Sequence, residues 1–475
     1  MGVLVRTDMC VIGAGSGGLS VAAAAAQMGA RVVLIEKGQM GGDCLNYGCV
    51  PSKSLIAAAH AAHAIRTGAR FGVNGHEPEV DFLKVRDHVR EVIATIAPHD
   101  SQGRFEGLGV LVIRAAARFA GPREVQAGDV RIRARRFVIA TGSSPAVPSS
   151  LGIKDVSFLT NETIFDLDDR PEHLIVVGSG PIGSEFAQAH RRLGARVTVL
   201  GRGRLLPKDD PDAVAVVRKQ LVEEGVVLHE GAAIDSVMRH GNGVAVAVRY
   251  RDGEDETLKG SHLLIAVGRQ PNVDGMDLEA ADVVYDARGI QVDARLRTTN
   301  PRIFAIGDVA GGYQFTHVAS YHAGIVIRNA LFKLPAKVDY RAVPWVTYTD
   351  PELAHVGLSE AAAAERGLAV KALTWSFAEV DRAQAERETE GFVKIVVDRN
   401  GRVLGATIVG PRAGELIQVW ILAIQEGIKI GRIAQMIAPY PTLGEISKRV
   451  AGSYFTPALF SERTRTVVRF LQRLG

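Results

Sequence analysis

The chain has 475 residues, of which 47% are hydrophobic and 23% charged, a composition typical of a folded globular protein and not of a disordered or fibrous one. At about 150 residues per domain, the length predicts roughly three domains, each large enough for its own core. A formal charge of +4 is too dilute to indicate a nucleic-acid partner, and three cysteines exclude both a disulfide scaffold and a four-cysteine zinc site. We therefore expect a small molecule or ion as substrate and predict no metal site.

The most apolar stretch of the chain, residues 9–35, is interrupted by GAGSGG and by two polar residues, Gln27 and Arg31. It is therefore a poor candidate for a membrane-spanning helix. No cleavable signal precedes it, and Arg6 stands where a myristoylation motif needs Ser or Thr. The sequence thus predicts a cytoplasmic protein with no membrane partner.

A strand, a glycine turn, a helix and a second strand are predicted in that order in residues 8–35, which is the βαβ unit of a dinucleotide-binding fold. Its glycines have the GxGxxG spacing: Gly13, Gly15 and Gly18. Glu36 ends the second strand, 23 positions after Gly13. The glycines permit a pyrophosphate to approach the helix N-terminus, and the carboxylate can accept hydrogen bonds from both hydroxyls of a ribose. This unit is therefore predicted to bind a dinucleotide.

The same unit recurs in residues 173–200. Its glycines are Gly178, Gly180 and Gly183. Counting the same 23 positions from Gly178 reaches Gly201, so the acid is missing. The cations that follow are Arg202, Arg204 and Lys208. Loss of the carboxylate and gain of cations suit a 2′-phosphate, so we expect NADPH to be preferred to NADH. The alternative is that these cations are only solvated surface residues.

Each dinucleotide fold has a predicted return strand that ends at a glycine, as expected where a buried strand meets a bound nucleotide. These strands are RFVIATG, which ends at Thr141 and Gly142, and HLLIAVG, which ends at Gly268. A further buried strand, RIFAIGD, stops at Asp308, which is positioned to hydrogen-bond a polyol chain.

Two of the three cysteines, Cys44 and Cys49, lie in GGDCLNYGCVPSK, after the first fold's acid. If the apolar stretch that follows is a helix beginning near Pro51, Cys49 lies at its N-terminus, where the macrodipole and free N–H groups stabilise a thiolate. A disulfide in so small a loop is easily opened and can exchange electrons with a neighbouring flavin. We therefore predict a reactive pair, whereas Cys10, in the first strand, is expected to be buried and inert.

The chain resembles, over nearly its whole length, the class I pyridine nucleotide-disulfide oxidoreductases, which include dihydrolipoamide dehydrogenase, glutathione reductase and mercuric reductase. The resemblance rests on motifs in the family's order and spacing: GAGSGG, GGDCLNYGCVPSK, FVIATGSSP, GSGPIGSEFA, AVGRQPN, FAIGDVAGG and VTYTDPELAHVGLSE. It implies FAD in the first dinucleotide fold, NAD(P)H in the second and a homodimer formed through the C-terminal domain.

The predicted fold is α/β, with two Rossmann-like dinucleotide-binding domains and a C-terminal α+β dimerisation domain. Its segments are 1–148 (first part of the FAD-binding domain), 149–268 (NAD(P)H-binding domain), 269–338 (central return segment of the FAD-binding domain) and 339–475 (dimerisation domain). From Val343 onward, strands alternate with two helical stretches and no glycine fingerprint occurs, so we expect that segment to be a separate domain for subunit contact.

The resemblance also implies roles for single residues. Cys44 would be the interchange thiol that attacks substrate, and Cys49 the charge-transfer thiol against the flavin. Lys53 would lie by the flavin N5 edge, paired with Glu185. The other residues implied to contact the cofactor are Lys37, Gly42, Ala117 at the adenine and Asp308 at the ribityl chain.

The C-terminal motif departs from the family's disulfide reductases, which read HPTxSE and use the partner subunit's histidine as the base for the interchange thiol. Here YPTLGE places Tyr440 at that position and Glu445 five residues later, with nothing basic beside it. A phenol of ordinary pKa about 10 cannot take a thiol proton at neutral pH as an imidazole of pKa about 6.5 can. A tyrosine here resembles mercuric reductases, although their C-terminal cysteine pair is missing, because no cysteine follows Cys49. Alternatively, Tyr440 only packs at the dimer interface.

We therefore predict a flavoenzyme that passes hydride from NADPH to FAD, then electrons to the Cys44–Cys49 disulfide and on to a disulfide, a soft metal ion or a quinone-like acceptor. One alternative is a dihydrolipoamide dehydrogenase running from dithiol to NAD, against which Gly201 and Tyr440 both argue. The other is a non-catalytic flavin-binding redox sensor, which rapid NADPH turnover with an acceptor would exclude.

Overall fold

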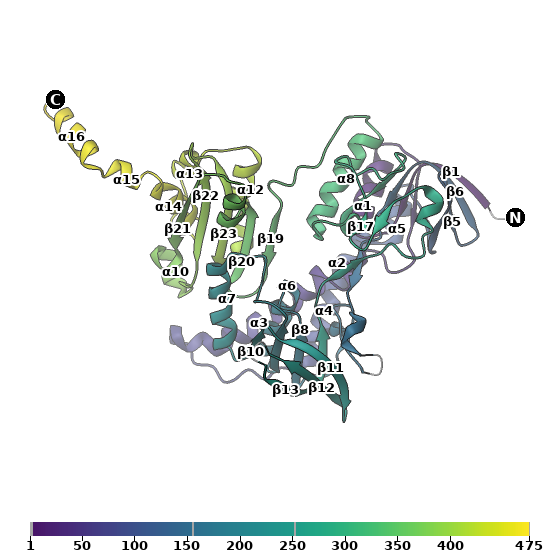
Figure 1. The fold of residues 1–475 in the computed structure, drawn as a ribbon, viewed down its shortest axis with the longest axis horizontal. Helices are drawn as coiled ribbons and strands as arrows, with labels where there is room; N and C mark the ends of the chain where they lie inside the picture. The colour runs from purple at the N-terminus through teal and green to yellow at the C-terminus, as the bar shows by residue number, and fades with distance from the viewer. Residues whose placement is uncertain (1–2, 154–155, 251–252, 475) are drawn as a thin grey trace. The chain divides into compact units, whose positions relative to one another are not determined.

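The computed structural model describes residues 3–153, 156–250 and 253–474 (Figure 1). The chain divides into a first compact unit, Met1–Arg204 with Val226–Val338, and a second, Leu205–Gly225 with Asp339–Gly475. The short segment Leu205–Gly225 thus belongs with the C-terminal part, although it lies inside the NAD(P)H-binding segment predicted from the sequence. Within the described ranges, no helix is long and apolar enough to cross a membrane.

A seven-stranded sheet forms the centre of the first dinucleotide fold, in the order β3-β2-β1-β6-β5-β4, with β18 beside β6. β1 pairs in parallel with β2 and β6, and β18 pairs in parallel with β6, so the predicted return strand and the RIFAIGD strand are both confirmed. The strands are β1 (Val3–Ile12), β2 (Val32–Ile35), β3 (Leu111–Ile113), β4 (Ala117–Gly121), β5 (Glu124–Ala127), β6 (Val130–Ile139) and β18 (Ile303–Ala305).

Both faces of this sheet are buried, which is why its central strands are nearly continuous apolar runs. Along β1, Met9 and Val11 belong to one core cluster, together with side chains of α1 (Ser16–Gln27) and α8 (Thr316–Ala330). Cys10 and Ile12 belong to the cluster on the opposite face, as the two-residue period of a strand requires. Cys10 is fully buried, as predicted.

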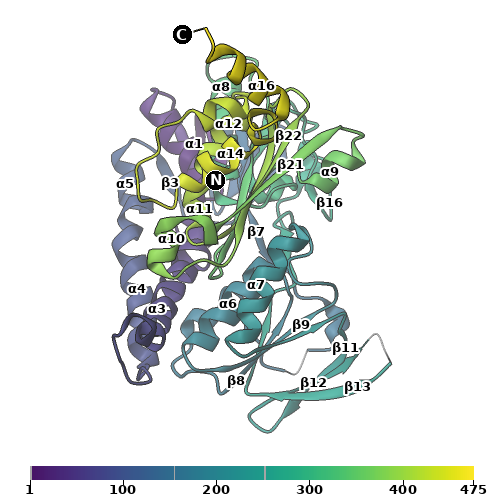
Figure 2. The same ribbon diagram turned by 90° about the vertical axis from the view of Figure 1, so that its left-hand side faces the viewer.

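The cysteine segment leads into two long helices, α3 (Cys49–Thr67) and α4 (Phe82–Ile96), which pack side by side (Figure 2). The short helix α2 (Gly42–Asn46) precedes them, and α5 (Gln102–Gly107) follows. Pro51 lies in the first turn of α3, where a residue without an N–H group loses no helical hydrogen bond. The predicted helix start near Pro51 is therefore confirmed, and it falls on Cys49 itself.

The second dinucleotide fold repeats the first with a parallel sheet in the order β10-β9-β8-β14. α6 (Pro181–Arg192) connects β8 to β9, and a three-stranded antiparallel sheet, β11-β12-β13, precedes β14 in the chain. The strands are β8 (His173–Val177), β9 (Arg196–Gly201), β10 (Val226–Glu230), β11 (Ala233–His240), β12 (Gly243–Arg249), β13 (Asp255–Gly260) and β14 (His262–Ile265). The recurrence predicted from the glycine spacing is confirmed.

Two small antiparallel ladders complete the first unit. β7 (Ser143–Pro145) pairs with β15 (Arg269–Pro271), and β16 (Tyr285–Asp286) pairs with β17 (Gly289–Ile290). The first ladder joins the chain directly after the first return strand to the chain directly after the second. It therefore connects the two dinucleotide folds within this unit.

The second unit is built on a five-stranded antiparallel sheet in the order β19-β20-β23-β22-β21. α7 (Pro211–Glu223) packs against β20 and β23. Trp420 and Phe377 are fully buried in its core. The strands are β19 (Pro344–Thr347), β20 (Glu352–Gly357), β21 (Val370–Ser376), β22 (Phe392–Asp398) and β23 (Val403–Gly410).

The prediction of only two helical stretches in this unit is wrong. Short helices follow one another because turns interrupt the apolar pattern, as at Gly427 (φ +63°) between α12 and α13. The helices are α9 (Glu360–Glu365), α10 (Asp381–Glu386), α11 (Ala413–Leu416), α12 (Gln418–Gln425), α13 (Ile430–Ala434), α14 (Glu445–Ser453), α15 (Thr456–Leu459) and α16 (Glu462–Leu471).

Candidate active site

Backbone atoms of neighbouring segments lie very close to the glycines of the first glycine turn. A Cβ added at Gly13, where φ is +103°, would lie 2.3 Å from the carbonyl oxygen of Ala140, and one at Gly18 would lie 1.9 Å from the carbonyl oxygen of Gly13. Only glycine fits at either position. Gly15 begins α1 with no side-chain cap, so the first N–H groups of the helix remain available to an anion.

Glu36, at the end of β2, is held beside this turn. Its Oε2 accepts a hydrogen bond from the Ala14 N–H at 2.6 Å, and its Oε1 accepts one from the Gly38 N–H at 2.6 Å. A carboxylate has about four acceptor sites, so capacity remains for two ribose hydroxyls. The carboxylate can therefore still make the ribose contact predicted from the sequence.

The second glycine turn has the same construction. A Cβ at Gly178 would lie 2.2 Å from the carbonyl oxygen of Ala266, and one at Gly183 would lie 2.0 Å from that of Gly178. At Gly180, by contrast, no described protein atom lies within 4 Å of an added Cβ. Glycine at this position leaves space at the helix start, and a bound pyrophosphate requires that space.

Gly201 ends β9 where Glu36 follows β2 in the first fold. A Cβ at Gly201 would lie 2.5 Å from the Ser179 hydroxyl oxygen, so Ser179 leaves no room for an acidic side chain there. Arg202 is exposed directly after this position. Lys208, which was also predicted to bind the nucleotide, lies in the segment that belongs to the second unit.

Cys44 and Cys49 lie on successive helices, Cys44 within α2 and Cys49 at the first residue of α3. The Cys49 sulfur is 3.4 Å from the hydroxyl oxygen of Thr316, at the start of α8. A hydrogen bond from the Cys44 thiol, aided by Thr316 and by the charge of Lys53, lowers the pKa of Cys49 to about 6. The same hydrogen bond and burial raise the pKa of Cys44. At neutral pH the proton of the reduced pair therefore resides on Cys44.

The cysteine helix is tied to the second dinucleotide fold by one ion pair. Lys53 Nζ on α3 donates to Glu185 Oε2 on α6 at 2.8 Å, and only 8% of the Glu185 side chain is exposed. The pairing implied by the family resemblance is therefore present. A cavity of about 410 Å³ adjoins this region between α3 and α4 and is lined by Cys49, Val50, Lys53, Ser54, Ala57, His88, Val92 and Ile96.

Asp308 lies in a short helical turn directly after β18 and is held by residues that the sequence analysis did not select. Its Oδ2 accepts a hydrogen bond from Ser143 Oγ at 2.6 Å. Arg269 donates to the same serine at 2.7 Å and pairs with Asp43 Oδ1 at 3.0 Å. Burial raises the pKa of Asp308. Arg269 stands in AVGRQPN and Ser143 in FVIATGSSP, so the quoted motifs contained the signal.

The remaining predicted cofactor residues all lie in the first unit. Thr141 and Asn272 exchange two hydrogen bonds, of 2.7 and 2.9 Å, which fix the loop after β6. Ala117, at the start of β4, is buried, whereas Lys37, after β2, is exposed. Gly42, Gly142 and Gly268 all have positive φ, and a Cβ at Gly42 would lie 2.6 Å from Gly15 Cα. The glycine turn and the cysteine segment are therefore in direct contact.

The C-terminal motif lies in the second unit. The Tyr440 hydroxyl donates to Asp381 Oδ2 at 2.8 Å, and this hydrogen bond raises the tyrosine pKa. The expectation that nothing basic lies beside Glu445 is wrong, because Arg449, one helical turn later on α14, pairs with Glu445 Oε1 at 2.8 Å. The (i, i+4) spacing of these two residues was the signal that could have shown it. Because the pKa of Tyr440 is raised, even less of its hydroxyl is ionised at neutral pH than in an ordinary tyrosine.

Two dinucleotide folds and a cysteine pair at a helix start define a flavin- and pyridine-nucleotide-dependent oxidoreductase. Residues 7–323 match the pyridine nucleotide-disulphide oxidoreductase family, and residues 343–451 match the dimerisation domain of that family. The chain therefore belongs to this family, whose members use FAD and a pyridine nucleotide, and the second match supports a homodimer.

Several named proteins are similar to the chain over most of its length. The mercuric reductase of Streptomyces lividans is 37% identical, covering 94% of this chain and 96% of that protein, and the dihydrolipoyl dehydrogenase of Geobacillus stearothermophilus is 36% identical with the same coverage. Among solved structures, LpdA from Mycobacterium tuberculosis superposes with a TM-score of 0.86 at 30% identity, covering 95% of this chain and 99% of that chain. A Cu(II) complex of the HOCl-induced flavoprotein disulfide reductase RclA from Escherichia coli gives 0.84 at 28% identity, covering 94% and 99%.

The residues of the first dinucleotide fold fit FAD. A backbone cradle at Gly13 and Gly18 leads to the uncapped start of α1, which suits a pyrophosphate. Glu36 retains acceptor capacity at the predicted ribose position, and Asp308 is a half-buried acceptor shortly after β18. These residues would hold the cofactor when it is bound. Within the described ranges, no three His, Cys, Asp or Glu side chains are grouped so as to hold a metal ion.

The two cysteines are expected to respond differently to substitution. Cys49→Ser should retain FAD but lose the long-wavelength absorbance band of the reduced holoenzyme, because that band needs a thiolate against the flavin and Cys49 has the lowered pKa. Cys44→Ser should keep the band, since a serine hydroxyl can still donate to Cys49, and should lose turnover. Anaerobic spectra during NADPH titration measure the band, and the rate of NADPH oxidation with an acceptor measures turnover. Cys10→Ala is the matched control. A normal band in Cys49→Ser would reverse the two roles.

Proposed function

We propose that this protein is an NADPH-dependent reductase that delivers electrons through FAD and the Cys44–Cys49 pair to a thiophilic metal ion such as Hg(II) or Cu(II). The observation that carries the proposal is a redox pair with an asymmetric proton distribution combined with a C-terminal motif that offers no base. We also propose a cytoplasmic location, because a pair that must be reduced in every cycle suits a reducing compartment.

Residues of the first unit have different roles in electron transfer. Bound FAD supplies hydride acceptance from NADPH and two-electron transfer to the disulfide. Lys53, fixed by Glu185, stabilises the Cys49 thiolate that forms when the disulfide opens. Cys44 keeps its proton until an electrophile displaces it, because burial and its hydrogen bond to Cys49 disfavour ionisation.

A metal acceptor explains the missing base better than a disulfide acceptor does. A thiol–disulfide exchange needs a base to deprotonate the interchange thiol and an acid to protonate the leaving thiol. A soft metal ion displaces a thiol proton on binding and leaves no thiol to be protonated. One NADPH then supplies two electrons, which reduce one Hg(II) to the metal or two Cu(II) to Cu(I), with release of one proton.

The second candidate function is dihydrolipoamide oxidation with NAD, favoured only by the similarity to dihydrolipoyl dehydrogenases. An acceptor screen separates the two. The purified holoenzyme is supplied with NADPH and Hg(II), Cu(II), lipoamide, glutathione disulfide or a quinone, and the reverse reaction is run with dihydrolipoamide and NAD. We expect metal-dependent NADPH oxidation that requires both Cys44 and Cys49. Faster turnover with dihydrolipoamide and NAD, or with a disulfide, would refute the proposal, and no turnover with any acceptor would support a redox sensor.

Nucleotide preference is expected to depend on Arg202. Because Gly201 presents no carboxylate, kcat/KM should be higher for NADPH than for NADH in the wild type. Arg202→Ala should narrow that preference by about tenfold or more, the value of a charge-assisted contact to phosphate. Steady-state kinetics with both nucleotides measure this, and Arg239→Ala, another exposed arginine of the first unit, controls for net charge. Equal kcat/KM for the two nucleotides in the wild type would show that the cations are only surface residues.

Tyr440 is expected to contribute to the reduction of the metal acceptor. Because the hydroxyl proton is donated to Asp381, the hydroxyl oxygen would act as an acceptor or ligand toward the group bound at the cysteine thiolates, and Tyr440→Phe should lower kcat/KM for the metal acceptor by about tenfold. Tyr440→His should leave disulfide turnover negligible and impair the metal reaction. Tyr285→Phe is the matched control, since that hydroxyl also donates to a carboxylate, on Glu279.

Two other results for the Tyr440 variants would contradict this expectation. A gain of about 10²–10⁴-fold in disulfide turnover by Tyr440→His, the usual value of a general base, would identify a disulfide reductase that lacks its base. Unchanged kinetics in both variants would make Tyr440 a packing residue only.

A further inference from the structure

The chain ends in a helix that lies outside both matched segments of the family. The dimerisation-domain match stops at residue 451, and α15 and α16 follow it. Figure 1 shows them leading away from the sheet of the second unit. None of the residues of α16 is buried. The helix therefore contributes little to the core of its own chain.

One face of α16 is apolar and exposed. Val467 and Leu471 lie four residues apart in α16, which places them on one side of the helix, and Leu474 follows three residues after the last residue of α16. Their exposed fractions are 50%, 55% and 70%, and that of the neighbouring Phe470 is 60%. An exposed apolar face of this kind indicates an interaction site.

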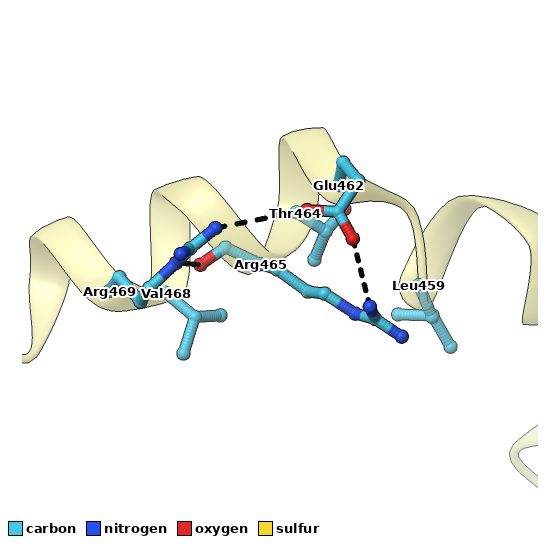
Figure 3. Close-up of a pocket in the computed structure, with 6 residues that line it drawn as sticks. All are labelled: Leu459, Glu462, Thr464, Arg465, Val468 and Arg469. Carbon is cyan, nitrogen blue, oxygen red and sulfur yellow. Dashed lines mark hydrogen bonds and ion pairs between the residues drawn. The ribbon is translucent and has the colours of Figure 1, made fainter.

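The opposite face is basic. Arg465 and Arg469 lie four residues apart on α16, and Glu462 pairs with them at 2.8 and 3.8 Å (Figure 3). Arg473 follows two residues after the end of the helix. Residues 462–474 hold four arginines and one glutamate, against a formal charge of only +4 for the whole chain. Most of the protein's excess positive charge is thus concentrated on this segment.

We propose that α16 and the residues directly after it are a peripheral membrane anchor that lies in the plane of an anionic lipid surface, with Val467, Phe470, Leu471 and Leu474 in the headgroup boundary. A helix with an apolar face of Leu and Phe and an arginine-rich polar face is the arrangement that such surfaces bind. Arginines near the surface add electrostatic attraction to anionic headgroups. Two copies of the helix in a homodimer strengthen the binding through effective concentration.

A second copy of this chain suits the same face less well. The dimerisation-domain match ends at residue 451, before α16 begins at Glu462, so the homodimer that this match supports does not require the apolar face of α16. Outside residues 462–474 the formal net charge is +1 (+4 minus +3), so a second copy of the chain carries no net negative charge that would attract the arginines. The sequence-based expectation of no membrane partner rested on the lack of a spanning segment, and a helix lying on the surface needs none.

The test is flotation of the purified holoenzyme with vesicles. We expect it to float with vesicles of equimolar phosphatidylglycerol and phosphatidylcholine, not to float with pure phosphatidylcholine, and to be released by high salt. Leu471→Ser with Leu474→Ser should lower the bound fraction by about tenfold or more. Met238→Ser, which removes an equally exposed apolar side chain on β11, should not lower it. NADPH oxidation in solution should be the same in all three proteins, because α16 carries no active-site residue.

Two results would overturn this inference. The first is the absence of binding to phosphatidylglycerol vesicles, or binding that the double variant retains. The second is a loss of the dimer in the double variant, measured by light scattering, which would assign the apolar face to the subunit interface.

Discussion

Cys49 begins α3, and its sulfur is surrounded by groups that favour the thiolate: the Cys44 thiol, the Thr316 hydroxyl and the Lys53 ammonium. The helix macrodipole acts in the same direction. Each of these groups is positioned by a different part of the first unit. Lys53 is fixed by Glu185 on α6, Thr316 stands at the start of α8, and Cys44 is placed by α2, whose first residue contacts the glycine turn. The stability of this one anion thus depends on both dinucleotide folds.

The kind of acceptor that the cysteine pair can reduce depends on which groups can take up and release protons. The reduced pair keeps one proton on Cys44, and the C-terminal motif offers a tyrosine whose hydroxyl is already committed to Asp381 and a glutamate committed to Arg449. In the proposed reaction, neither residue would shuttle protons for a thiol leaving group. An acceptor that coordinates to thiolates and leaves as a metal or a lower-valent ion avoids that requirement.

Much of the fold followed from local pattern. Apolar runs such as DMCVIG became buried strands, the repeated glycine spacing gave two similar folds, and the helix start near Pro51 was found at Cys49. Long-range partners could not be predicted in this way. Thr316 reaches Cys49 across 267 positions, and Arg269 pairs with Asp43 only because β7 and β15 meet. The pairing of Arg449 with Glu445 is local, by contrast, because their (i, i+4) spacing on α14 is visible in the sequence.

The most direct test of this account is the pH dependence of the long-wavelength absorbance band in the anaerobically reduced holoenzyme. Because the pKa of Cys49 is lowered, its thiolate exists above that pKa, so the band should persist at neutral pH and be lost as the pH falls through about 6. Thr316→Val, which removes a hydrogen bond to the thiolate, should move the midpoint upward. A band that forms only as the pH rises through about 8.5, the ordinary value for a cysteine, would contradict the claim that this site is built around a Cys49 thiolate.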